Sequence, residues 1–78
     1  MNTFPLSQLE PGEQGVIETL QQYGAMRRRL RDLGFLPGTK ILCAFSAPAG
    51  SPRAFFLKGF VVALRKSDCD NILVSACE

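Results

Sequence analysis

The sequence predicts a mostly β domain, a small and partly open barrel of five short strands with one short α-helix after the first strand. Short runs rich in β-branched and aromatic residues alternate with proline-glycine turns along most of the chain. One window, residues 23–33, instead shows a helical period. Strands this short form a stable core only if the sheet curls to enclose one face, which indicates a barrel. A chain of 78 residues has room for a single domain, residues 1–78.

The first strand is expected at residues 15–20, after a docking turn at residues 5–9 and a Pro11-Gly12 turn. The helix follows at residues 23–33. On a helical wheel its apolar residues fall within roughly 80°, so they should all face the barrel; these residues are Tyr23, Met26, Leu30 and Leu33. Gly34 stands where a left-handed helix end is expected.

The remaining strands are expected at residues 39–47, 53–59, 60–66 and 72–76, with a tight turn at Lys58-Gly59. In the first of these, alternation predicts that Ile41, Cys43 and Phe45 share one face. Residues 48–52 read as a loop, and Ser67 is expected to cap a short helical turn. Most of the aromatic residues stand at positions where a core is needed.

Charge is unevenly distributed along the chain. Residues 27–66 hold all nine basic residues and only one acid, Asp32, a local balance of +8. The arginines of residues 27–31 admit three readings: a solvated helix face with an Arg28–Asp32 pair, a surface for a protein partner, or a nucleic-acid surface. The last reading is the weakest, because small barrels that bind single strands present exposed aromatic side chains among their basic groups.

The order and spacing of short motifs along the chain are more specific indicators of function than its charge. The stretches "PLSQLEPGE", "LxxLGFLPGT", "AP-x-G-x-P", "ALRK" and "ILV" occur in an order that resembles the FeoA family, the small partners of the bacterial iron transporter FeoB. The resemblance implies an SH3-like barrel in the cytoplasm that assists or regulates ferrous iron uptake. It would bind the cytosolic part of FeoB, which includes a GTP-hydrolysing domain, and so be recruited to the inner face of the membrane.

Seven residues are candidates for contacting this partner, because they lie on the helix outside its apolar stripe, form the 48–52 loop or end a strand: Arg27, Arg28, Arg31, Pro48, Gly50, Ser51 and Arg65. The chain departs from the family at Ser51, where many members have aspartate. If that aspartate contacts a partner, serine would weaken the contact or indicate a different one.

The residues for enzymatic catalysis are missing. The chain has no histidine, its cysteines stand in no motif, and neither a P-loop nor a dinucleotide fingerprint occurs. Asp68, Cys69 and Asp70 are weak metal candidates, and a transient contact with Fe²⁺ has no ligand set to support it. We expect no enzyme, no cofactor, no direct nucleic-acid partner and no membrane insertion; self-association stays open.

One alternative function has the same fold. Metal-dependent repressors of the diphtheria-toxin-repressor type carry a similar small barrel, so the chain could be a regulatory module that acts with a DNA-binding partner. A helix-turn-helix does not fit in 78 residues beside the barrel, so the DNA-reading part would have to be a separate protein.

Overall fold

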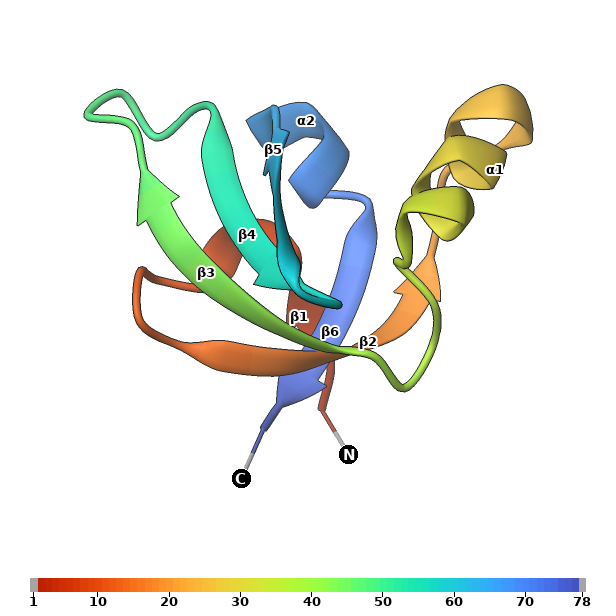
Figure 1. Cartoon of the computed structure of the whole chain (residues 1–78), viewed down its shortest axis with the longest axis horizontal. Helices are drawn as coiled ribbons and strands as arrows, with labels where there is room; N and C mark the ends of the chain where they lie inside the picture. Colours follow the sequence, from red (N-terminus) through yellow and green to blue (C-terminus); the bar gives the residue numbers. More distant parts are fainter. Residues whose placement is uncertain (1, 78) are drawn as a thin grey trace.

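The computed structural model describes residues 2–77, which form one antiparallel sheet of six strands with helices at its rim (Figure 1). In chain order the elements are β1 (Phe4–Pro5), the 3-10 helix η1 (Leu6–Gln8), β2 (Gln14–Leu20), α1 (Gly24–Leu33), β3 (Lys40–Ser46), β4 (Arg53–Leu57), β5 (Phe60–Leu64), α2 (Lys66–Cys69) and β6 (Ile72–Ala76). The predicted fold class is confirmed: the five predicted strands and the helix after the first of them are all present.

The strand order is β1-β6-β2-β3-β4-β5, so β1 and β5 form the two edges of the curled sheet (Figure 1). Strand β1 is not predicted by the sequence pattern. Two residues are too few to show alternation, and the partners of Phe4 and Pro5 are Val74 and Leu73, at the other end of the chain. Only the folded chain brings these residues together.

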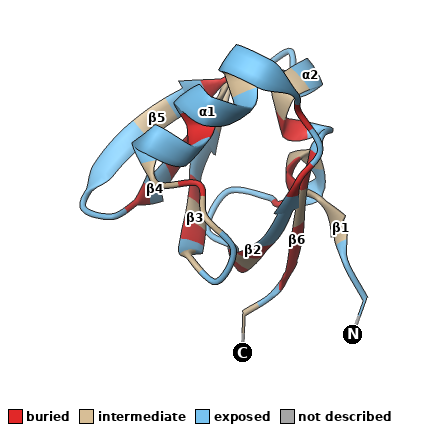
Figure 2. Cartoon of the chain, turned by 90° about the vertical axis from the view of Figure 1, so that its right-hand side faces the viewer, coloured by how far each residue is buried: buried red, intermediate tan, exposed pale blue. Residues whose placement is uncertain are grey.

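The core lies on the inner face of this sheet, and Figure 2 shows buried residues concentrated on the strands while α1 is mostly exposed. Its buried members include both leucines of the predicted docking turn and residues from most elements; the largest are Leu6, Ile17, Leu30, Phe35, Ile41, Phe55, Leu57, Ile72 and Val74. Among the described residues, no helix has the length and apolar composition needed to cross a bilayer.

The expectation that the aromatic residues belong to the core is wrong for most of them. Phe35 and Phe55 are fully buried, but Phe45, Phe56 and Phe60 are exposed. Phe45 leaves the face of Ile41 and Cys43 because β3 contains a bulge: two residues of β3 span one step of β4 between the pairs Cys43–Phe55 and Phe45–Ala54. The bulge interrupts the alternation on which the prediction rested.

Helix α1 contacts the barrel mainly through one residue. Leu30 is fully buried and Met26 half-buried, whereas Leu33 is 37% and Tyr23 88% exposed. The prediction that all four face the barrel is therefore wrong for Tyr23, and Leu33 is only partly covered. Tyr23 has extended backbone angles at the position before the helix, so the helical wheel does not describe where its side chain points.

The end of α1 is a Schellman turn. Gly34 adopts a left-handed φ of 109°, its N–H donates to the Arg31 carbonyl, and the Phe35 N–H donates to the Leu30 carbonyl, both at 3.0 Å. Leu30 and Phe35 are both buried in the core, which is the apolar contact that accompanies this turn. The predicted left-handed helix end at Gly34 is confirmed.

The 48–52 loop supports α2 from outside that helix. The Lys66 N–H, at the first residue of α2, donates to Ser51 Oγ at 3.1 Å. The predicted cap, Ser67, lies inside the helix and does not cap it. The first N–H of α2 therefore donates to a hydroxyl from a loop distant in sequence, and not to the local Ser67 side chain that was expected to cap the helix.

Two cysteines belong to the core. Cys43 and Cys69 are fully buried, and no cysteine forms a disulfide among residues 2–77. Burial raises the pKa of both thiols, that of Cys69 to about 12. Neutral thiols in the core behave as small apolar groups.

We predict that Leu30→Ala lowers the free energy of unfolding by about 2–5 kcal/mol, because it removes the buried anchor of α1 and leaves a cavity. Leu33→Ala, which removes a side chain of the same size from the exposed end of the stripe, should cost less than about 1 kcal/mol. Urea unfolding of both variants measures the difference, and equal losses would contradict the anchoring role of Leu30.

We predict that Ser51→Ala costs about 1 kcal/mol of stability, because the Lys66 N–H loses its acceptor. Ser67→Ala should be neutral, since its side chain makes no hydrogen bond in the described part of the chain. Ser51→Asp should retain or increase stability, because a carboxylate at a helix start accepts the same bond. Thermal unfolding of the three variants measures these effects, and a loss at Ser67 alone would contradict the assignment.

We predict that the free energy of unfolding falls as pH rises above about 9. The folded pKa of Cys69 lies above its unfolded value, so its contribution is complete below the unfolded pKa and is lost between the two, at about 1.4 kcal/mol per pH unit. The wild type should therefore lose more stability than Cys69→Ala between pH 8 and pH 10. Parallel losses would show that Cys69 ionises freely in the folded chain.

Candidate partner-binding site

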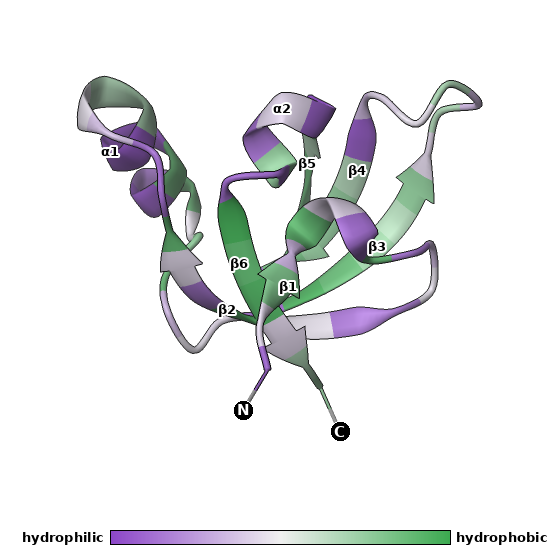
Figure 3. Cartoon of the chain, turned by 180° about the vertical axis from the view of Figure 1, so that it is seen from behind, coloured by the Kyte–Doolittle hydropathy of each residue, from purple (hydrophilic) through white to green (hydrophobic). Residues whose placement is uncertain are grey.

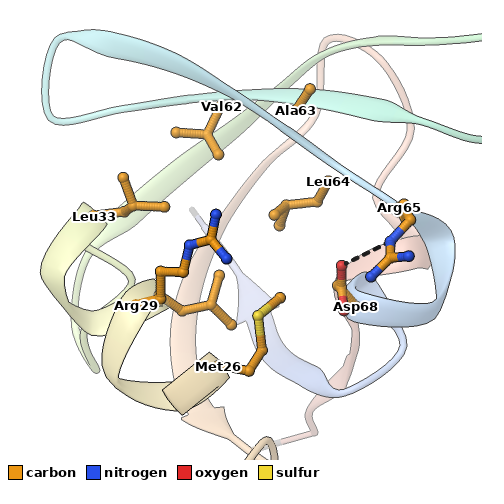
Figure 4. Close-up of a pocket in the computed structure, with 9 residues that line it drawn as sticks. Met26, Arg29, Leu33, Val62, Ala63, Leu64, Arg65 and Asp68 are labelled. Atoms are coloured by element: carbon orange, nitrogen blue, oxygen red, sulfur yellow. Dashed lines mark ion pairs between the residues drawn. The ribbon is translucent and has the colours of Figure 1, made fainter.

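A pocket of about 240 Å³ opens between α1, β5 and the start of α2 (Figure 4). We call it the α1–β5 groove. One wall comes from α1 and the opposite wall from β5, with the first residues after β5 closing one end; its lining residues are Met26, Arg29, Leu30, Leu33, Val62, Ala63, Leu64, Arg65 and Asp68.

Apolar side chains form most of the groove's walls, and its charged lining residues are Arg29, Arg65 and Asp68. Figure 4 shows the Met26, Leu33, Val62 and Leu64 side chains around the opening, with the Arg29 side chain among them. At the far end Arg65 Nε lies 3.5 Å from Asp68 Oδ2. Arg29 forms no ion pair with any described residue, so the groove offers one free cation beside an apolar surface.

The predicted arginines Arg27, Arg28 and Arg31 lie together on the outer face of α1. They line a shallow depression with Gly24 and Asp32, and Figure 3 shows hydrophilic residues on this helix. The expected Arg28–Asp32 pair does not form within residues 2–77. Both side chains are exposed, where an ion pair gains little and orders two flexible groups. This face therefore carries solvated positive charge.

The other predicted residues lie elsewhere. Pro48, Gly50 and Ser51 belong to the loop between β3 and β4, which lies on the opposite side of α2 from α1 (Figure 1). Ser51 is engaged with the Lys66 N–H. Arg65 alone reaches the α1–β5 groove. The structure thus distributes the predicted contacts over three places and does not join them into one site.

Arg29 and the groove itself are not among the features predicted from the sequence. Arg29 lies three residues after Met26 and four before Leu33, a spacing that places it at the border of the apolar stripe. The apolar run of residues 60–64 was a second signal. Neither shows that β5 is an edge strand, because strand order is set by long-range pairing.

The weak metal candidates do not converge. Cys69 is buried in the core, the Asp68 carboxylate pairs with Arg65, and the Asp70 carboxylate accepts from Ser7 Oγ at 2.5 Å. That hydrogen bond, with Lys66 nearby, holds the pKa of Asp70 below its usual value. Among the described residues, no three histidine, cysteine or acidic residues are grouped so that they could hold a metal ion.

Comparison with known proteins places the chain in a family. The FeoA domain model matches residues 4–76. Over 69 residues, or 88% of this chain, the sequence is 33% identical to the Fe(2+) transport protein A/Fe(2+) transporter FeoB fusion protein of Porphyromonas gingivalis; the chain spans about 8% of that protein's length.

Solved structures agree with this match. The chain is similar to Stenotrophomonas maltophilia FeoA complexed with zinc, described as a procaryotic SH3 domain protein, with 30% identity and a TM-score of 0.82; the match covers 92% of this chain and 89% of that one.

The fold alone is shared more widely. IdeR of T. acidophilum has a TM-score of 0.85 at 15% identity, covering 99% of this chain and 35% of that one. Because the identity is so low, this likeness concerns the fold alone. The family match, the FeoA/FeoB fusion and the SH3-like neighbour agree: this chain belongs to the FeoA domain family, which is linked to ferrous iron transport.

Proposed function

We propose that this chain is a non-enzymatic accessory module of ferrous iron uptake, which binds the cytosolic part of a FeoB-type transporter and is thereby recruited to the inner face of the membrane. The observation that carries the proposal is the fusion: in the Porphyromonas gingivalis relative, a segment similar to this chain is joined to FeoB in one polypeptide. Fusion holds two modules at a high effective concentration, which favours pairs that associate.

The surface of α1 supports a protein partner. Arg27, Arg28 and Arg31 are exposed, lie side by side and are opposed by Asp32 alone in their depression. Such a face accelerates encounter with an acidic surface and makes the association salt-dependent. We keep these arginines, with the 48–52 loop and Arg65, as the predicted contact residues.

Two of the three thiols are poor candidates for catalysis. A cysteine nucleophile needs an accessible thiolate, and Cys43 and Cys69 are fully buried with raised pKa values, whereas Cys77 is partly exposed. The chain also has no histidine to act as a general base. These features support a module that acts by binding.

We predict that the immobilised protein binds the purified cytosolic domain of a FeoB-type transporter, measured with and without guanine nucleotide. Arg27→Glu should leave the fold intact and weaken this binding several-fold, because it reverses one charge on the α1 face. Lys40→Glu makes the same change of charge at an exposed site on β3 and is the matched control. Absence of binding in every nucleotide state up to high micromolar concentration would contradict the proposal.

A further inference from the structure

The edge strand β5 has an unpaired side. Within residues 2–77 it pairs only with β4 and ends the strand order, so one row of its backbone groups has no strand partner there. Its sequence, Phe60–Leu64, contains no charge and no proline, the features that usually protect an edge from pairing with other chains. An unprotected apolar edge is a template for one more strand.

The tight turn before β5 identifies which backbone groups are free. Lys58 and Gly59 both have positive φ, 53° and 87°, as a two-residue type I′ hairpin requires. In such a hairpin the closing pair, Leu57 and Phe60, exchanges hydrogen bonds, and the bonded pairs then recur at every second residue. Val62 and Leu64 are therefore bonded to β4, while the N–H and C=O groups of Val61 and Ala63 point outward.

The α1–β5 groove lies along this free side. Val62, Ala63 and Leu64 all line it, although neighbouring side chains of a strand point to opposite faces. A pocket that meets three consecutive residues therefore meets the edge of the strand and not one of its faces. Helix α1 bounds the groove on the side away from β5 (Figure 4), so a chain that paired with this edge would lie between β5 and α1.

The lining specifies the chemistry of that chain. Met26 and Leu33 on α1, with Val62 on β5, offer apolar contacts for every second side chain of an added strand. Arg29 stands among them without an ion-pair partner in the described residues, so an acidic side chain would complement it. A folded second copy fits poorly, because in each copy α1 forms the opposite wall of the groove beside the β5 edge.

We propose that the α1–β5 groove binds an extended segment of a partner protein, with alternating apolar and acidic residues, as a seventh strand paired with β5. The proposal deepens the proposed function, on which it rests for the identity of the partner. The α1 arginines then attract the acidic partner, and the groove holds one of its segments through backbone hydrogen bonds to Val61 and Ala63.

Amide hydrogen exchange of the full chain tests this directly. In the free protein the Val62 and Leu64 amides should be protected, and those of Val61 and Ala63 should exchange fast. Two probes are added separately: the FeoB-type cytosolic domain and a synthetic peptide of alternating valine and aspartate. Binding of either probe should slow exchange at Val61 and Ala63 by at least about tenfold, which corresponds to a protection of roughly 1.4 kcal/mol.

Substitutions at one position separate the backbone contact from side-chain effects. Ala63→Pro removes an outward N–H without removing a bond to β4, and an edge strand tolerates proline at such a site. It should weaken binding about tenfold, whereas Ala63→Val, which adds bulk but keeps the N–H, should change affinity less than about threefold. Arg29→Glu, with Lys40→Glu as its control, tests whether an acidic side chain of the bound segment pairs with Arg29. This test stays valid even if Ala63→Pro does not fold.

The outcomes distinguish the two proposals. If the transporter domain binds and Val61 and Ala63 stay unprotected, strand addition is wrong and the proposed function stands. If only the peptide binds with protection, the groove is correct and the proposed partner is wrong. If neither probe protects these amides, strand addition is overturned. Protection that grows with protein concentration alone, together with a doubled mass, would assign the edge to a second copy and likewise overturn it.

Discussion

The attachment of α1 to the barrel through Leu30, Gly34 and Phe35 determines most of what this fold can present to a partner. Gly34 turns the chain in a left-handed conformation, and Leu30 and Phe35 pack into the core on either side of it. A side chain at Gly34 would carry the strain of a positive φ and would approach Lys58 Cγ to 3.2 Å. The first turns of the helix contact the core only through the half-buried Met26, and the α1–β5 groove lies between α1 and β5 (Figure 4).

The outer and inner faces of α1 therefore have different roles. The outer face of α1 carries solvated arginines, which act at a distance and lose their effect in salt. The inner face carries Met26, Leu33 and Arg29, which act only on a group inside the groove. In our proposals the first face raises the rate of encounter with the transporter and the second provides the lasting contact.

The candidate site was only partly predictable for the same reason that local patterns fail elsewhere in this chain. Ser51 was expected to contact a partner, yet its hydroxyl accepts the first N–H of α2, a role that an aspartate at this position could also fulfil. The bulge in β3 turned Phe45 outward. Arg29 and Val62 belong to one groove only because β5 ends the sheet opposite α1. Each of these facts depends on a partner that is distant in sequence.

By itself the sequence determined the number and type of the main elements, the helix end at Gly34, the tight turn at Lys58-Gly59 and the family, because these depend on backbone preferences, local periodicity and motif order. Tertiary structure alone decided that β1 pairs with β6, that Tyr23 is exposed and that β5 keeps a free edge along α1. Strand order and register arise from contacts between residues far apart in the chain, and a local pattern contains no information about which of two strands will lack a neighbour.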